Sequence, residues 1–491
     1  PYNFKKNEDF TYVPGKMCNF SIRVDKKEGT GQYHLTLISE SITAWENDLV
    51  SHNAQAKEYV VIHSEAGKLR QCIEAAHKDW RTLKNLKLTG SINSQDCYFM
   101  RDSMDNLTAL NMKEVSVSGK MGERPWFKGE AANDDVERPG ILTTRAFDEK
   151  TSLLSVVLPD KLTAIGMSAF RSCVNLSGSI YVPEGVIAIG GGAFMWDKSL
   201  TGTLSLPSTL EYIGGGGNVG THGAFVECQF NCELILPDKL KYIGHNAFAG
   251  NPNFYGNLKL PSNLEFIGDN AFAGDQNLTG NLEIPDKVSF ICQGAFSGTG
   301  FNGTLTLPAG LKNIQNDAFR GVPLKGELDL PKNLTSIGSD AFNGCDFSGT
   351  LKLPKHLISI GRSVFAYNWR LMGVVEFPEG LQSIGAGAFA NCRSLEGLVF
   401  PSTLESIGYE ATWGDNGGAF ANCYGIGSIV CKGTEPAHVL AGAFNGVPKD
   451  NFTLEVPESS ITQYQAASGW KEFQRIAAHH ELVCRPSVAR A

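Results

Sequence analysis

The feature that most constrains this chain is a column of thirteen regularly spaced phenylalanines. Nearly all of them follow Ala, and successive members are 23 or 24 residues apart, with two gaps of 31. A fixed period in this range indicates a solenoid, in which small repeats bury their apolar faces only by stacking on one another. We therefore expect function on the surface of the stack rather than in an enclosed pocket. The column consists of Phe147, Phe170, Phe194, Phe225, Phe248, Phe272, Phe296, Phe319, Phe342, Phe365, Phe389, Phe420 and Phe444.

The repeat unit reads G-x-L-x-L-P-x-x-L-x-x-I-G-x-x-A-F-x-x-C/N/D-x-x-L, with clear copies starting at Gly256 and Gly326. The L-x-L piece predicts a short strand with one buried face, and Pro ends it because Pro cannot donate to a sheet ladder. A second apolar piece follows, and then a Gly at a position where positive φ or close backbone approach is expected. Cys292 and Gln315 replace this Gly in two repeats. We expect Ala-Phe to form the core between parallel coils about 4.8 Å apart.

This pattern resembles the BspA-like leucine-rich repeat family over about residues 141–447. The L-P, I-G-x-x-A-F and following Cys motifs carry the resemblance. It implies a β-rich repeat solenoid of short parallel strands, turns and short helical or 3-10 segments, with about 13 regular repeats. It also implies a surface or secreted protein of gut or oral bacteria or of parasitic protists. Some members of the family are adhesins, and many have no known ligand.

The segments before and after the regular repeats lack the regular repeat pattern. With them, the chain divides into five expected segments. Residues 17–24 and 33–42 read as alternating strands and resemble the end of a fimbrillin-like β-sandwich domain. The expected segments are the end of a preceding β-rich domain (1–50), degenerate N-terminal repeats forming a cap with a surface loop (51–140), the regular repeats (141–447), a C-terminal strand and helix cap (448–480) and a linker (481–491).

Both caps have predicted elements. In the N-terminal cap we expect strands at 60–62, 86–88 and 110–112, a helix over 69–80 and a polar loop over 120–140. In the C-terminal cap a strand at 452–457 precedes a helix that Ser459 or Ser460 can cap. One face of that helix carries Ile461, Tyr464, Trp470, Phe473 and Ile476.

Composition excludes several classes of protein. The net charge of −8 is spread along the chain and no polybasic run indicates nucleic acid or anionic lipid as a partner. No stretch of 18 apolar residues exists, so we expect no membrane span. The chain begins at Pro1 without Met or a signal peptide, so we expect a processed or trimmed fragment. We expect a monomer, and the resemblance to the BspA-like family implies a location at the cell surface or secretion.

The 12 cysteines mostly follow the repeat rather than a disulfide pattern. Five lie three residues after the column Phe, and Asn or Asp takes the same position in other repeats. An interchangeable position of this kind indicates a structural ladder, where Cys acts as a small buried residue with a weak S–H donor. We expect free thiols, with a bond between adjacent members such as Cys392 and Cys423 as the alternative. The ladder includes Cys173, Asp197, Cys228, Asn251, Asp275, Cys345, Asn368, Cys392 and Cys423.

The motifs that could indicate nucleotide binding, metal binding or catalysis are weak. Residues 215–220 read G-x-G-x-x-G but lack the preceding strand, long helix and distant acid of a dinucleotide site. His222, Cys228 and Cys232 match no zinc spacing, and His479-His480 reads as an exposed pair. Acids on the strand face, such as Glu283, alternate with Lys and Thr. We expect no catalytic, cofactor-binding or metal-binding residues, while a glycosidase pair formed across repeats stays open.

Two insertions, 215–223 and 409–418, interrupt the repeat at the same point, just before Ala-Phe. Insertions at a fixed point emerge on one face of a solenoid, often the binding face. Exposed aromatic side chains there are frequent contact anchors. The alternative is that the loops are merely tolerated and the Trp residues partly buried. The candidate ligand contacts are Trp413, Tyr409, Asn218, His222, Trp196 and Trp369.

Two functions fit this sequence. The first is a non-catalytic binding or adhesion scaffold that recognises a host or bacterial surface protein or glycan through an extended surface. The second is a structural spacer within a larger surface protein, without a ligand of its own. A contiguous apolar or aromatic patch favours the first function, whereas an enzyme needs a deep pocket with convergent ionisable groups.

Overall fold

The chain forms two compact units, residues 1–57 and 58–491. In the first unit, β1 (Asn19–Lys26) pairs antiparallel with β2 (Tyr33–Ser41), which confirms the two alternating strands predicted there. The structure is a computed structural model that describes residues 19–26, 33–41, 58–123, 133–134, 136–215, 223–409 and 418–479.

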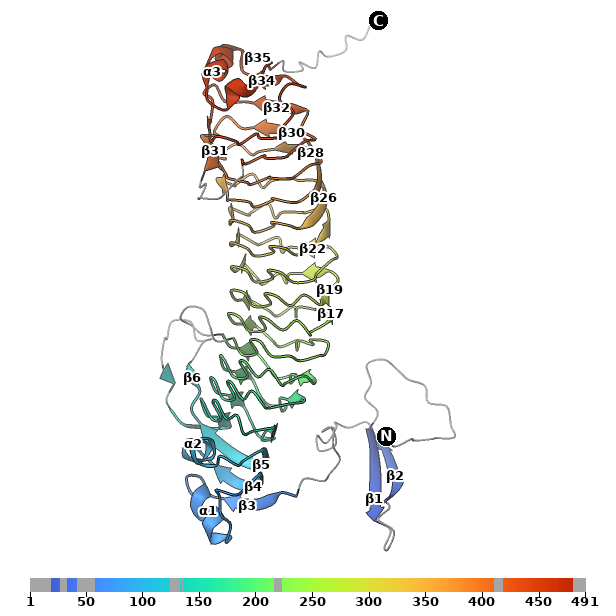
Figure 1. Ribbon diagram of the computed structural model, residues 1–491, viewed down its shortest axis with the longest axis vertical. Helices are drawn as coiled ribbons and strands as arrows, with labels where there is room; N and C mark the ends of the chain where they lie inside the picture. Colours follow the sequence, from blue (N-terminus) through green and yellow to red (C-terminus); the bar gives the residue numbers. More distant parts are fainter. Residues whose placement is uncertain are drawn as a thin grey trace, which may run out of the picture. The chain divides into compact units, whose positions relative to one another are not determined.

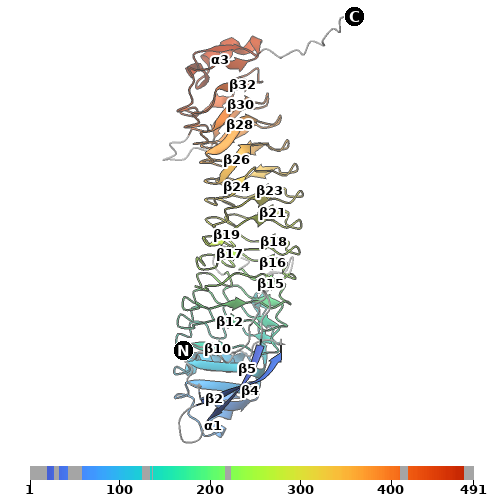
Figure 2. The ribbon, with the colours of Figure 1, turned by 90° about the vertical axis from the view of Figure 1, so that its right-hand side faces the viewer.

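The second unit is a parallel β-solenoid whose coils stack along one axis (Figure 1, Figure 2). A typical coil contributes a strand at or near L-x-L, turns at Pro, contributes a second strand before the recurring Gly, and turns again through Ala-Phe. Strands at equivalent positions pair in register from coil to coil, so two ladders run along the stack. The predicted repeat solenoid is confirmed.

The second ladder is built from short strands that place an apolar residue inward. Its strands are β9 (Ile141–Leu142), β11 (Ala164–Ile165), β13 (Ala188–Ile189), β15 (Tyr212–Ile213), β16 (Tyr242–Ile243), β18 (Phe266–Ile267), β21 (Phe290–Ile291), β23 (Asn313–Ile314), β25 (Ser336–Ile337), β27 (Ser359–Ile360), β29 (Ser383–Gly385), β31 (Ser406–Tyr409) and β33 (His438–Val439).

The first ladder begins as isolated strand pairs and becomes one seven-stranded sheet toward the C-terminus. Its strands are β10 (Ser155–Val157), β12 (Ile180–Tyr181), β14 (Leu204–Ser205), β17 (Gly256–Asn257), β19 (Leu278–Thr279), β20 (Leu282–Glu283), β22 (Leu305–Thr306), β24 (Lys325–Gly326), β26 (Asp346–Thr350), β28 (Arg370–Glu376), β30 (Leu395–Phe400), β32 (Ser428–Cys431), β34 (Leu454–Val456) and β35 (Ile476–Ala478).

The first ladder corrects one local expectation. The L-x-L piece at 258–260 was expected to be the strand, yet the paired residues there are Gly256–Asn257, which bond to Leu278–Thr279. The alternating burial holds, because Leu258 is buried and Lys259 exposed. Burial pattern therefore predicted the side-chain directions, while hydrogen-bond register depended on the neighbouring coil.

The N-terminal cap is a wider version of the same architecture. Its strands pair parallel in the order β3, β4, β5 and β10, while β8 pairs antiparallel with β5 and β6 with β7. The predicted strands are all present, and the predicted helix is shorter than expected because it ends at Ala75. The elements are β3 (Val60–Ser64), α1 (Leu69–Ala75), β4 (Asn85–Ile92), α2 (Ser94–Ser103), β5 (Ala109–Gly119), β6 (Gly122–Glu123), β7 (Asn133–Asp134) and β8 (Arg138–Pro139).

The phenylalanine column forms a continuous stack of rings at the centre of the solenoid. Neighbouring ring centroids lie 5.2–5.8 Å apart, slightly more than the expected strand spacing, and the rings are within 29° of parallel. Every ring of the column is 0–2% exposed. The preceding Ala lets the backbones approach, since each column Phe N–H from Phe147 to Phe420 donates to the carbonyl before the next column Phe. The predicted role of Ala-Phe as core is confirmed.

The C-terminal cap differs from the predicted single helix. It consists of η2 (Glu458–Ser460), α3 (Ile461–Ala466), η3 (Trp470–Glu472) and the last strand β35. Gly469 has φ 83° and separates α3 from η3, so Ile476 lies in β35 rather than on a helical face. Ser460 occupies the N-cap position of α3 but makes no side-chain capping hydrogen bond. Trp470 and Phe473 still cover the last column ring, with centroids 5.4 Å from that of Phe444.

Candidate functional site

One position of the coil, the second residue after the column Phe, has a fixed backbone conformation. We call it the corner position. All thirteen corner residues have φ between 52° and 82°. Each corner N–H from Glu149 to Asn422 donates to a carbonyl of the next coil at 2.7–3.0 Å. The left-handed conformation therefore belongs to the coil-to-coil hydrogen bonding of the fold.

Most corner positions carry residues that tolerate this conformation. Six are Gly, and Asn occupies two others. The other five corner residues are Glu149, Ser172, Glu227, Trp196 and Tyr367. Trp196 and Tyr367 are the two aromatic ones, and a bulky side chain at positive φ is a backbone outlier. Their side chains are 39% and 49% exposed, so burial does not explain them. Outliers of this kind cluster at functional sites.

Tyr367 belongs to a patch on three successive coils, which we call the aromatic corner patch. Corner residues and the residues two positions later form it. Trp369 and Tyr424 are each 55% exposed, and Arg393 between them is also exposed. They lie just before β28, β30 and β32, which are neighbouring strands (Figure 1). The patch consists of Tyr367, Trp369, Asn391, Arg393, Asn422 and Tyr424.

Contacts inside the patch involve five of its six side chains, all except that of Tyr367. The Arg393 guanidinium lies over the Trp369 ring, 5.9 Å from its centroid. Tyr424 Oη donates to Asn422 Oδ1 at 2.9 Å, and Asn422 Nδ2 donates to Asn391 Oδ1 at 3.2 Å. Arg393 has no carboxylate partner within 4 Å among the described residues. The patch thus offers three exposed rings, those of Tyr367, Trp369 and Tyr424, together with one uncompensated cation and two hydrogen-bonded amides.

Trp196 and Trp369 do not form one surface. Their coils are separated by seven ring-to-ring steps of 5.4–5.8 Å along the column. Trp196 instead neighbours Lys198 and Glu227, which form an ion pair at 3.3 Å. Of the two candidate tryptophans, only Trp369 belongs to an aromatic patch.

The remaining candidates lie in or beside the insertions. Asn218, His222 and Trp413 fall outside the described residues, as does the G-x-G-x-x-G at 215–220 except for Gly215. Tyr409 ends β31, and nothing is described of its side chain. Both insertions start after a second-ladder strand, β15 or β31, so they are anchored at equivalent points of the coil.

The ladder position three residues after the column Phe has a structural role. Cys173 and Cys392 each donate their S–H to the column Phe carbonyl of the preceding coil, at 3.0 and 3.1 Å. Asn368 Nδ2 makes the same bond at 2.8 Å. Cys228 also belongs to this ladder, and Cys232 accepts from the Leu204 backbone N–H. The prediction that the ladder cysteines are free thiols is confirmed for the five described.

The thiols of this ladder are unreactive by environment. Burial raises the pKa of the Cys423 thiol to about 12 and that of Cys228 well above its ordinary value. A thiol that stays protonated is a poor nucleophile and a poor metal ligand. Within the described ranges, no group of three or more His, Cys, Asp or Glu side chains is arranged to hold a metal ion.

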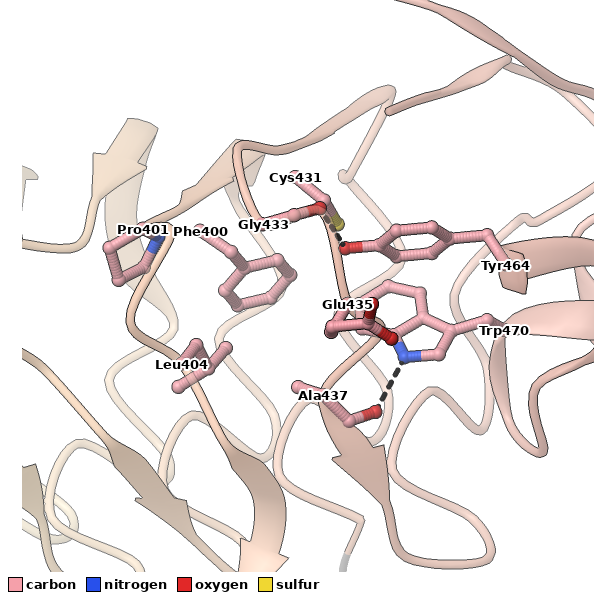
Figure 3. A pocket seen from close by; sticks show the side chains of 9 residues that line it. All are labelled: Phe400, Pro401, Leu404, Cys431, Gly433, Glu435, Ala437, Tyr464 and Trp470. Atoms are coloured by element: carbon pink, nitrogen blue, oxygen red, sulfur yellow. Dashed lines mark hydrogen bonds between the residues drawn. The ribbon is translucent and has the colours of Figure 1, made fainter. Parts of the chain in front are cut away.

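The best-formed hollow in the described part of the chain lies under the C-terminal cap (Figure 3). Its volume is about 10 Å³, at the lower limit for a single water molecule. Tyr464 Oη donates to the Gly433 carbonyl at 3.0 Å, and Trp470 Nε1 donates to the Ala437 carbonyl at 2.8 Å. These bonds satisfy polar groups that the cap buries, so the hollow belongs to the packing of the cap.

Two further features concern the strand face and the helices. The strand-face acids Glu283 and Glu327 are exposed, as the alternation with Lys and Thr predicts. Among the described helices, none has the length and hydropathy of a membrane span.

Sequence reasoning found Trp369 but missed the other members of the patch. The signal was present in the repeat register. Read down the position four residues after the column Phe, successive coils give Trp369, Arg393 and Tyr424. The corner position gives Tyr367, where Gly344 stands one coil earlier. Neither alignment shows that the side chains are exposed and mutually ordered, which depends on the stacking of the coils.

Comparisons with known proteins agree with this architecture. A family model described as a BspA type leucine rich repeat region matches residues 140–279, 205–325 and 291–426, which together exceed half of the chain. No curated protein sequence gives a significant match.

Several solved structures are similar to this chain at low sequence identity. A leucine-rich repeat protein from Bacteroides ovatus is 20% identical over 71% of this chain and 90% of its own, with a TM-score of 0.41. A leucine rich cell surface protein from Faecalibacterium prausnitzii is 18% identical over 87% and 95%, with a TM-score of 0.31. The pneumococcal vaccine antigen PcpA is 13% identical over 96% and 100%, with a TM-score of 0.38. On the strength of the family match, this chain belongs to the BspA-type leucine-rich repeat family.

Proposed function

We propose that this protein is a non-catalytic binding scaffold, displayed at the cell surface or secreted, that holds a protein or glycan ligand on the aromatic corner patch. One observation carries the proposal. Tyr367 keeps a bulky aromatic side chain at a left-handed corner where six other coils have Gly. Holding such a residue at positive φ costs about 1–2 kcal/mol, and its exposed ring recovers little of this by burial.

The surroundings of Tyr367 support a ligand contact. Exposed Trp and Tyr side chains supply large contact area with few rotatable bonds, and Arg shares their enrichment at binding hot spots. Here the contacts within the patch already hold these groups, which lowers the entropic cost of ordering them on binding. An extended patch without a deep pocket suits a macromolecule better than a small substrate.

The second insertion adds candidate contacts to the same region. It interrupts the coil that carries Asn422 and Tyr424, immediately before that coil's Ala-Phe turn. We include Tyr409 and Trp413 in the proposed surface for this reason. Asn218 and His222 belong to the first insertion, which precedes Phe225, eight repeats before Phe420 in the sequence. We include them only for a long ligand.

The proposal is tested by finding a ligand and then altering the patch. The purified chain is probed against an array of glycans and host surface proteins, and Trp369→Ala is compared with the parent. A hot-spot contact predicts binding weakened by about tenfold or more. The melting temperature should stay nearly unchanged, since the side chain is more than half exposed.

Matched corner variants separate binding from stability. Tyr367→Gly places at this corner the residue that six other coils have, so it should weaken binding without lowering the melting temperature. Trp196→Gly makes the same change at a distant corner and should leave binding intact. If the patch variants bind every array ligand as the parent does, the aromatic corner patch is not the binding site and the proposal is wrong. If the parent binds none, the spacer function is favoured.

A further inference from the structure

Resting on the proposed function, we infer that the aromatic corner patch takes an acidic glycan, a polymer with uronate carboxylates that runs along the stack axis. The inference names the class of ligand from three features of the patch: the spacing of its rings, the free charge between them and the row of amides beside them.

The rings lie along the axis rather than around a pocket. Trp369 and Tyr424 occupy the same position of coils two steps apart, and the column rings of these coils are 5.2 and 5.5 Å apart at successive steps. A disaccharide can span this interval, with one pyranose face against each ring. Protein hot spots, in contrast, favour well-packed and fully desolvated pockets. The patch residues do not line the small hollow under the C-terminal cap.

Arg393 supplies the charge. Arg393 occupies the equivalent position of the coil that lies between the coils of Trp369 and Tyr424. Its guanidinium lies over the Trp369 ring. Arg171 and Arg370 of the same stack are neutralised, by Asp148 at 2.7 Å and by Asp346 at 3.3 Å. Arg393 has no such partner in the described part of the chain, and the exposed Glu396 of the same coil forms no ion pair with it. A planar guanidinium matches a carboxylate in a bidentate arrangement.

The two asparagine side chains of the patch add hydrogen-bonding groups beside Arg393 and the rings. Tyr424 donates to Asn422, and Asn422 donates to Asn391. This direction of donation leaves the Asn391 Nδ2 group without a protein acceptor within the described ranges. An amide N–H₂ group at this point can donate to a sugar hydroxyl or ring oxygen. Nucleic acid is the poorer candidate because the chain carries a net charge of −8 and offers one free cation in the patch.

The experiment measures binding of two uronate polymers, polygalacturonate and hyaluronate, by titration calorimetry at fixed ionic strength. Fully methyl-esterified polygalacturonate is the neutral counterpart of the first. The parent is expected to bind polygalacturonate at least about tenfold more tightly than its methyl ester, as a charge-assisted hydrogen bond predicts. Arg393→Gln should abolish that preference, and Trp369→Ala should weaken binding of acid and ester alike. Hyaluronate tests whether a second uronate polymer is also bound.

Arg320→Gln is the matched control, because Arg320 is an exposed arginine of the same stack that pairs with Asp317 at 3.2 Å. It should bind like the parent. Equal binding of acid and ester, or a preference that survives Arg393→Gln, overturns the acidic class. The absence of binding to both polygalacturonate and hyaluronate also overturns the acidic class of ligand. If a protein from the array then depends on Trp369, the binding function stands and its ligand is a protein. If no ligand depends on the patch, the proposed function fails as well.

Discussion

At the scale of single residues, the ladder position shows why Cys, Asn and Asp interchange. The position lies next to the column Phe carbonyl of the preceding coil, so a side-chain donor there can add a hydrogen bond between coils. A thiol does so in Cys173 and an amide in Asn251, at 3.0 and 2.8 Å. Val322 and Val447 occupy the same position without a donor. A carboxylate has no proton to donate. Asp197 is fully buried and both of its side-chain oxygens lack a partner among the described residues.

This geometry predicts a pH-dependent stability. Burial raises the pKa of the Asp197 carboxyl well above its ordinary value. A folded pKa above the unfolded one means that the folded state holds the proton more tightly. The free energy of unfolding should therefore fall as pH rises above about 4, until the folded pKa is passed. Asp197→Asn, which places the residue of other coils here, should match the parent near pH 4. At pH 8 it should be about 1–3 kcal/mol more stable.

Denaturant unfolding from pH 4 to pH 9 measures this difference. Glu283→Gln alters an exposed acid of the strand face and serves as the control, with the pH profile of the parent. A gap between Asp197→Asn and the parent that is constant across the range would show that Asp197 is ionised in the folded protein.

At the scale of the structural elements, the strands are too short to hold the fold by themselves. Most strands of both ladders are two residues long, and the coil-to-coil bonds of the Ala-Phe turn add to their pairing. The stacked rings supply the apolar core that such short strands need. Burial of each Phe contributes about 1.5–3 kcal/mol, and each ring contacts rings on both sides. The column is thus the main element that joins coil to coil.

Removing one ring should therefore be costly. Phe272→Ala, or Phe342→Ala, leaves a cavity between rings that lie 5.4–5.8 Å away on either side. The expected loss is about 3–5 kcal/mol in the free energy of unfolding, measured by denaturant titration. Tyr255→Ala removes an aromatic side chain that is 50% exposed and should cost much less. Equal midpoints for the two kinds of variant would contradict the role of the column.

At the scale of the whole stack, stability is approximately a sum over coils and their interfaces, so an end without a cap frays first. The C-terminal cap prevents this with Trp470, which is 1% exposed and contacts the rings of Phe400 and Phe444 at 6.0 and 5.4 Å. The cap also continues the first ladder, because β35 pairs with β34. The ring stack therefore ends against Trp470, and the sheet ends at β35 within the cap.

Trp470→Ala should loosen the C-terminal coils selectively. Hydrogen exchange followed by peptide mass spectrometry should show faster exchange around residues 418–456, with little change around residues 141–200. The physical reason is the nearest-neighbour nature of the stack, in which the loss of one interface reaches only a few coils. Uniformly faster exchange along the stack would instead mean that the coils unfold as one unit.

The sequence by itself determined the solenoid, because a core built from identical positions must repeat the residues that fill it. The Phe column, the ladder position and the parallel stacking were all predicted from spacing. The same reasoning missed the break at Gly469 and the strand at Ile476, since helical spacing of apolar residues does not report a left-handed glycine.

Only the tertiary structure decided what the surface offers. The corner position has no signature in the sequence, because Gly, Asn, Glu, Trp and Tyr all occupy it, and its left-handed φ follows from hydrogen bonds to the next coil. Trp369, Arg393 and Tyr424 are far apart in the chain and meet only because their coils stack. Core positions repeat under the same packing constraint in every coil and can be read from periodicity. Surface residues are free of that constraint, so their juxtaposition appears only when the coils are stacked.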